Sequence, residues 1–274
     1  MACANTFYDS GFKETMKPLP HTLTGNSQSK QLVVFLHGWP DTLELWGKFL
    51  PQFEKDYLIL NISYPNFSDQ ELEKKGANFS EILERLKFSI GTVNQAGRKI
   101  TFVAHDWGAI FAYLFDDAYP RKLSDLIAVD VAPWFKVTFS IVAYQLWLVK
   151  AFLIGGKLGD FMVQSLLPVL KYNPPYKKRI KADWGYLYYY NLKFVLKSLF
   201  DLKKIPLSNY EPSCPIAYVY GKNKPAQFQN NRWLEKISAD PKNYVKELNA
   251  GHWIMNEESE FLLDLIKKRL QKNS

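Results

Sequence analysis

One short stretch, residues 100–109, constrains the fold of this chain more than any other. Its first half is apolar and β-branched, as expected of a buried strand, and a helix-forming run follows Asp106. Ala104 and Gly108 lie two positions before and after Asp106, which is the small-x-nucleophile-x-small spacing of a nucleophile elbow. Such a strand-to-helix turn displays one side chain, and its neighbours are small because larger ones would collide with the backbone. The alternative is that Asp106 only caps the following helix.

Strand and helix patterns alternate on both sides of this stretch. Apolar runs bounded by turn residues predict strands at residues 31–36, 57–62, 100–104, 126–131, 216–220 and 244–248. Apolar residues at helical spacing predict helices at residues 79–93, 107–117, 230–237 and 257–270. This alternation predicts an α/β fold with a mostly parallel sheet flanked by helices.

Residues 133–211 have a different texture, with helical stretches rich in Tyr, Trp and Phe, breaks at Gly and Pro, and no strand-like run. We therefore expect a helical insertion at residues 133–211, between two parts of an α/β core at residues 1–132 and 212–274. The most hydrophobic window of the insertion, residues 137–149, is bounded by lysines and is too short to span a bilayer. It predicts a buried or interfacial helix.

Composition and charge argue against several other classes of protein. The formal charge is +8, but basic residues alternate with acids along the chain and the densest basic run, residues 177–181, is short. Nucleic-acid binding is therefore not expected, while contact with an anionic membrane surface is left open. Cys3 and Cys214 offer neither a disulfide framework nor the spacing of metal ligands. No signal peptide or membrane-spanning segment is visible, so we expect a cytoplasmic protein, of open oligomeric state.

Three of the four histidines fall in motifs that follow predicted strands. His37 begins the run His-Gly-Trp-Pro, His105 precedes Asp106, and His252 lies in the run Ala-Gly-His-Trp after the last predicted strand. The fourth, His21, lies in the polar lead-in and is expected at the surface.

The order of these motifs resembles the α/β-hydrolase fold: strand-His-Gly-Trp-Pro, strand-Ala-His-Asp-Trp-Gly-helix, helical insertion, and a late Gly-His-Trp. Within that fold, the sequence resembles the aspartate-nucleophile branch, which contains epoxide hydrolases and haloalkane dehalogenases. The resemblance covers nearly all of residues 31–270. It implies a hydrolase that needs no cofactor or metal, with residues 133–211 forming a helical cap.

The resemblance implies a two-step reaction on a small, apolar, epoxide-bearing substrate. Asp106 would attack an epoxide carbon and form an alkyl ester. His252 would then activate a water that hydrolyses this ester and releases a vicinal diol. The family builds its oxyanion hole from two backbone N–H groups, which correspond here to those of Trp39 and Trp107.

The acid that orients the histidine departs from the epoxide-hydrolase pattern. That acid usually follows the strand at residues 216–220 as Gly-x-x-Asp, but residues 221–225 read Gly-Lys-Asn-Lys-Pro. Asp130, in the predicted strand that follows the turn at Asp106, is a replacement, because some dehalogenases carry their acid there. A carboxylate in so apolar a run needs a partner, and His252 would provide one. The alternative is that Asp130 only binds local backbone groups.

Two tyrosines of the insertion correspond to the family's general acids, which donate hydrogen bonds to the epoxide oxygen. Residues 143–147 resemble the family's Asp-Tyr-Gln-Leu segment and identify Tyr144 as the first. Residues 187–191 resemble the helix of the second, where Tyr190 fits best and Tyr189 is the fallback. The alternative is that these aromatic side chains only pack.

Two other functions remain open from the sequence. A haloalkane dehalogenase would use the same nucleophile, with Trp107 and a second N–H donor holding the halide, but the tyrosine matches favour an epoxide. A binding protein with a decayed site is the other alternative, because the usual acid is missing after Gly221.

Overall fold

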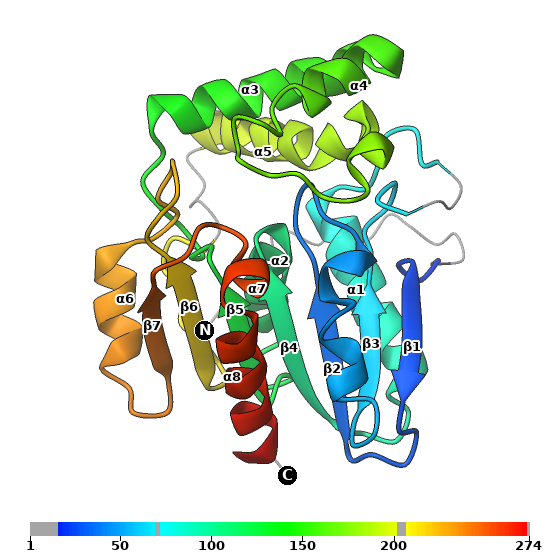
Figure 1. The fold of residues 1–274 in the computed structure, drawn as a ribbon, viewed down its shortest axis with the longest axis vertical. Helices are drawn as coiled ribbons and strands as arrows, with labels where there is room; N and C mark the ends of the chain where they lie inside the picture. Colours follow the sequence, from blue (N-terminus) through cyan, green and yellow to red (C-terminus); the bar gives the residue numbers. More distant parts are fainter. Residues whose placement is uncertain (1–15, 69–71, 202–206, 273–274) are drawn as a thin grey trace.

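A seven-stranded sheet forms the centre of this computed structural model, which describes residues 16–68, 72–201 and 207–272 (Figure 1). The strand order is β1-β3-β2-β4-β5-β6-β7; β1 runs antiparallel to β3, and all other neighbours are parallel. The mostly parallel α/β fold predicted from the sequence is confirmed. The strands are β1 (His21–Gly25), β2 (Gln31–Leu36), β3 (Leu58–Ile62), β4 (Lys99–His105), β5 (Asp125–Val129), β6 (Ile216–Gly221) and β7 (Tyr244–Leu248).

Helices cover both faces of the sheet, with α8 in front and α1 and α2 behind in the view of Figure 1. Every residue of β2, β3 and β5 is buried, as expected of parallel strands packed on two sides. The helices of this core are α1 (Phe79–Val93), α2 (Trp107–Ala118), α6 (Asn231–Ser238), α7 (Ile254–Glu257) and α8 (Ser259–Lys272), with short 3-10 helices η1 (Leu43–Trp46) and η2 (Leu50–Gln52).

The helix α1 shows why a helix and its first residue could be predicted from the sequence. Asn78 accepts a hydrogen bond from the backbone N–H of Glu81, and the Glu81 side chain accepts one from the Asn78 N–H, which forms a capping box. Ile82, Leu86 and Ile90 share one face at helical spacing and are buried against the sheet. The local cap and the apolar stripe therefore agree with the tertiary packing.

The helices between β5 and β6 lie together above the carboxyl ends of the central strands (Figure 1). Within the described part of the chain, no helix is both long and apolar enough to cross a membrane. The division at residues 133 and 211 into core and cap domains stays a prediction. The helices of the insertion are α3 (Phe139–Ile154), α4 (Gly156–Gln164), η3 (Lys177–Arg179), η4 (Ala182–Gly185) and α5 (Tyr186–Asp201).

Candidate active site

Asp106 lies in the sharp turn between β4 and α2. Its φ of 53° is in the left-handed region, which a non-glycine residue adopts only when its surroundings impose it. A methyl group on Gly108 would collide with the carbonyl oxygen of Leu36, and one on Gly38 would collide with the Asp106 side chain. Both glycines thus permit the tight approach of β2 to the turn. The Asp106 side chain makes no helix-capping hydrogen bond, in contrast to the alternative considered from the sequence.

His252 and Asp130 lie side by side at the carboxyl edge of the sheet. The Nδ1 of His252 is 2.5 Å from Oδ2 of Asp130, which is completely buried just after β5. Burial alone would lower the pKa of His252, but the charge and hydrogen bond of Asp130, followed by the charge of Asp106, raise it above its usual value. The Asp130 bond protonates Nδ1, so the neutral ring presents an unprotonated Nε2.

The other carboxylate oxygen of Asp130 has two further donors that the sequence did not reveal. Lys224 places its Nζ 2.5 Å from Oδ1, with a side chain only 2% exposed, and the Gly221 N–H donates to the same oxygen at 3.0 Å. Burial raises the pKa of Asp130, but the charges and hydrogen bonds of His252 and Lys224 lower it below its usual value. Lys224 occupies the position of the acid in the Gly-x-x-Asp pattern, which was the signal available in the sequence.

Burial raises the pKa of the Asp106 carboxyl to about 7. The charge of His252 and the backbone N–H of Trp107, which donates to the carboxylate, partly offset this rise, whereas the charge of Asp41 adds to it. The carboxylate is therefore poised near neutrality, close to the histidine. Trp39, the other predicted oxyanion residue, is buried and follows the glycine that packs on Asp106.

Two tyrosines from different helices of the insertion meet above the turn. The hydroxyls of Tyr144 on α3 and Tyr188 on α5 are 2.9 Å apart, and both rings make edge contacts with the ring of Trp39. The ring of Trp107 also makes an edge contact with the ring of Tyr188, and Trp107 works against the rise in the pKa of that tyrosine. Burial, with a contribution from the charge of Asp106, raises the pKa of both tyrosines well above the usual value. Both hydroxyls are therefore protonated and able to donate.

Tyr190, which the sequence comparison favoured as the partner of Tyr144, lies elsewhere. Its ring is half-buried beside the rings of Tyr186 and Tyr189, and the ammonium of Lys193 lies 5.9 Å from its centroid. The fallback, Tyr189, packs on Phe152. Two residues along an α-helix correspond to a rotation of about 200°, so Tyr188 and Tyr190 point to nearly opposite sides of α5.

His105 and Asp41 support the loop that carries His252. The Nε2–H of the buried His105 ring donates to the backbone carbonyl of His252 at 3.0 Å, and its Nδ1 is 3.7 Å from the Asp41 carboxylate. Asp41 is completely buried and accepts hydrogen bonds from the hydroxyls of Tyr172 and Tyr176 and, at 3.2 Å, from the indole N–H of Trp253. This cluster, which the sequence analysis missed, ties the segment after α4 to the core.

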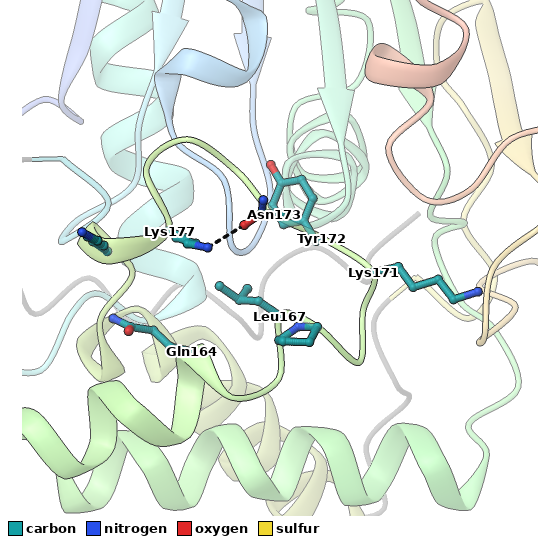
Figure 2. Close-up of a pocket in the computed structure, with 8 residues that line it drawn as sticks. Gln164, Leu167, Lys171, Tyr172, Asn173 and Lys177 are labelled. Atoms are coloured by element: carbon teal, nitrogen blue, oxygen red, sulfur yellow. Dashed lines mark hydrogen bonds between the residues drawn. The ribbon is translucent and has the colours of Figure 1, made fainter.

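A cavity of about 540 Å³ lies beside the loop that follows α4 and carries Tyr172 (Figure 2). Tyr172 lines it, but neither Asp106 nor His252 does, so this cavity is separate from the proposed catalytic side chains. No cluster of three or more His, Cys, Asp or Glu among the described residues is arranged to hold a metal ion. The lining residues are Gln164, Leu167, Pro168, Lys171, Tyr172, Asn173, Lys177 and Lys178.

Comparison with known proteins identifies the family of the chain. The sequence profile described as "Alpha/beta hydrolase family" matches residues 33–265. The chain belongs to the alpha/beta hydrolase family. Among curated members, "Epoxide hydrolase 1" of Caenorhabditis elegans is 22% identical over 290 residues, covering 97% of this chain and 71% of that protein.

Other similar proteins have different named activities. The rat "1-acylglycerol-3-phosphate O-acyltransferase ABHD5" is 23% identical over 279 residues, covering 89% of this chain and 78% of that protein. The solved structure of an epoxide hydrolase from Bacillus megaterium superposes with a TM-score of 0.69 at 18% identity, covering 92% of this chain and 96% of that one. Membership therefore fixes the fold and the hydrolase class, and the side chains at the sheet edge must decide the chemistry.

Proposed function

We propose that this hydrolase opens epoxides to vicinal diols through a covalent ester on Asp106. One observation carries the proposal: a histidine paired with an acid and two protonated tyrosines converge on the carboxylate of Asp106. A carboxylate can displace at carbon and form an alkyl ester, whereas serine nucleophiles act on acyl groups. The buried, aromatic surroundings favour an apolar substrate.

In the first step, an Asp106 oxygen bonds to an epoxide carbon as the carbon–oxygen bond of the ring breaks. The hydroxyls of Tyr144 and Tyr188 donate to the ring oxygen and protonate the alkoxide that forms. Tyr188 replaces Tyr190 in this role, since its hydroxyl is the one bonded to Tyr144. The edge contact between the rings of Trp107 and Tyr188 helps to hold this tyrosine in place.

In the second step, His252 removes a proton from water, which attacks the ester carbonyl. The acyl carbon–oxygen bond then breaks, the leaving diol oxygen takes the proton from the imidazolium, and the proton left on the Asp106 carboxyl returns to the tyrosine that was deprotonated in the first step. The backbone N–H groups of Trp39 and Trp107 are the proposed oxyanion hole for the tetrahedral intermediate. Esterification removes the charge of Asp106, which is one of the charges that raise the pKa of His252. The histidine thus becomes a neutral base more readily at the stage that needs one. Asp130 holds its tautomer and stabilises the imidazolium.

Carbon–halogen cleavage is the second candidate, and one observation favours it. The Trp39 indole N–H is buried and has no hydrogen-bond partner among the described residues, so it could donate to a halide. Against this function, the ring of Trp107, the shared donor of the dehalogenase pattern, packs edge-on against Tyr188, one of the two tyrosines that fit ring opening of an epoxide.

A single turnover in H₂¹⁸O tests the ester directly. Excess enzyme is mixed with styrene oxide, and the diol is analysed by mass spectrometry. An ester on Asp106 delivers unlabelled carboxylate oxygen to the first diol, whereas direct attack by water gives labelled diol. Asp106→Ala should lower diol formation by on the order of 10⁴-fold or more. Because burial raises the pKa of Asp106 to about 7, ring opening should decline as the pH falls below that value.

The same protein is incubated with a bromoalkane, and free bromide is measured. Bromide without diol would assign the chain to dehalogenation. Tight epoxide binding without any turnover would assign it to the class of binding proteins with a decayed site. Labelled diol in the first turnover would contradict the covalent mechanism.

A further inference from the structure

The outer face of α3 is apolar and exposed over the whole length of the helix. Figure 1 shows α3 lying across the top of the molecule, on the side of the insertion away from the sheet. Phe139 is 88% exposed at its start and Leu153 is 65% exposed at its end. The exposed side chains recur every three to four residues, so they form one stripe. Its large apolar members are Phe139, Val142, Leu146, Trp147, Leu153 and Ile154.

The helix α3 is exposed on this face although its other face is packed against the rest of the insertion. The opposite face of α3 buries Ile141, Leu148 and Ala151 against α4, α5 and η4. A helix on the surface of a protein in water normally pairs one apolar stripe with a polar outer face. In α3 both faces are apolar, and residues 137–149 supply large apolar side chains to both the buried and the exposed face.

Exposed apolar side chains also follow the turn that ends α3. Leu158 and Phe161 of α4 are 61% and 69% exposed. Ten of the 17 exposed large hydrophobic side chains among the described residues lie between positions 137 and 169. Such a concentration on one part of a surface marks an interaction site. Of the other seven, Val195 and Leu196 lie on α5, and the remaining five are single residues of the core.

The charges around this apolar face are almost all positive. Residues 136–185 contain eight Lys or Arg residues and two acids, Asp160 and Asp183. Both acids are half-buried, and Asp160 accepts a hydrogen bond from the Ala182 N–H. The exposed basic side chains on or beside α3 and α4 are those of Lys136, Lys150 and Lys157.

Further lysines flank the face on the side nearer the sheet. Lys171, Lys177 and Lys178 line the cavity of about 540 Å³, and Figure 2 shows it between α4 and the loop that carries Tyr172. These ammonium groups add to the positive charge of the insertion.

We propose that the outer face of α3 and the start of α4 dock onto the surface of an anionic lipid bilayer. Apolar side chains rimmed by lysines fit a surface that offers acyl chains beneath negatively charged headgroups. A second copy of the chain fits less well, because a two-fold contact would bring Lys150 and Lys157 toward their own copies without an exposed acid to pair them. The inference does not rest on the proposed epoxide chemistry, since docking involves no catalytic side chain.

Sedimentation with vesicles tests this docking without substrate. The full chain is mixed with vesicles of phosphatidylcholine alone, or of phosphatidylcholine with about one-third phosphatidylserine, at low and high salt. We expect sedimentation with the anionic vesicles, weakened by salt. The triple variant Phe139→Ser/Leu153→Ser/Phe161→Ser should bind at least about tenfold more weakly, because each side chain loses the transfer of its apolar area. These side chains are exposed, so the melting temperature should change little.

Two matched variants check specificity. Lys136→Gln/Lys150→Gln/Lys157→Gln should weaken binding by roughly tenfold or more at low salt. Lys48→Gln/Lys55→Gln/Lys267→Gln removes the same charge from exposed positions of the core and should retain most of the binding. Equal losses in the two lysine variants would overturn the assigned face. Failure to bind either vesicle would overturn the proposal, and a dimer abolished by the serine substitutions would assign the face to a second copy.

Discussion

The sheet edge and the insertion hold their candidate catalytic groups in different ways. At the edge, Asp106 and Asp130 follow directly on strands, and both have a positive φ that fixes the direction of the side chain. In the insertion, Tyr144 and Tyr188 project from helices, and their direction depends on the rotation of each helix about its axis. A motif therefore locates a group at the sheet edge by its position in sequence, whereas a group on a helix can be misplaced by one or two residues.

The largest expected effect tests the sheet edge. Asp130→Asn should slow ester hydrolysis by about 10⁴-fold, because an amide does not stabilise the imidazolium or enforce the Nδ1–H tautomer of His252. Ring opening does not use this pair, so the ester should accumulate. Mass spectrometry of the intact protein after mixing with styrene oxide should show an adduct of the substrate's mass.

The exposed Asp56→Asn serves as a matched control and should turn over normally. Adding Asp106→Ala to the Asp130→Asn background should abolish the adduct, since the proposed nucleophile is then absent. Hydrolysis of the ester at the wild-type rate in Asp130→Asn would mean that another group orients His252. The position of Asp130 after its strand would then predict where the carboxylate lies, but not that it orients His252.

The second prediction compares two tyrosines of the same helix. Tyr188→Phe should slow ring opening by about 10²-fold, because one of two proton donors is lost. Tyr190→Phe should change it by less than about twofold, since this hydroxyl lies on the other side of α5. The rate of formation of the adduct in the Asp130→Asn background measures this step alone. A larger effect of Tyr190→Phe than of Tyr188→Phe would restore the assignment made from sequence.

The insertion also shows where sequence reasoning reached its limit. The strands β2 to β7, the turn at Asp106 and the helix at residues 79–93 were predictable because local spacing, small residues and caps agree with the packing, whereas the edge strand β1 in the polar lead-in was not predicted. Tyr188, Tyr189 and Tyr190 are consecutive and chemically identical, so composition cannot tell which one faces the turn. Only the packing of α5 on α3 selects it.

Buried polar groups were the other limit, because their partners come from distant parts of the chain. Asp41 lies more than a hundred residues from Tyr172 and Trp253, and no local pattern connects them. The outer stripe of α3 was hidden for a similar reason. An apolar window predicts a helix, but which of its faces remains uncovered depends on the arrangement of α4 and α5.

The smallest expected effect concerns Lys224, which occupies the position of the acid in the Gly-x-x-Asp pattern. Its charge is among the influences that lower the pKa of His252, so Lys224→Met should raise that pKa further. Ester hydrolysis needs neutral His252, and its pH profile should therefore move to higher pH, with a rate at pH 7 reduced roughly two- to tenfold. Lys222→Met removes an exposed lysine two positions away and should leave the profile unchanged. If both variants keep the wild-type profile, the ammonium only fills space beside Asp130; a shift confined to Lys224→Met means that its charge tunes the base.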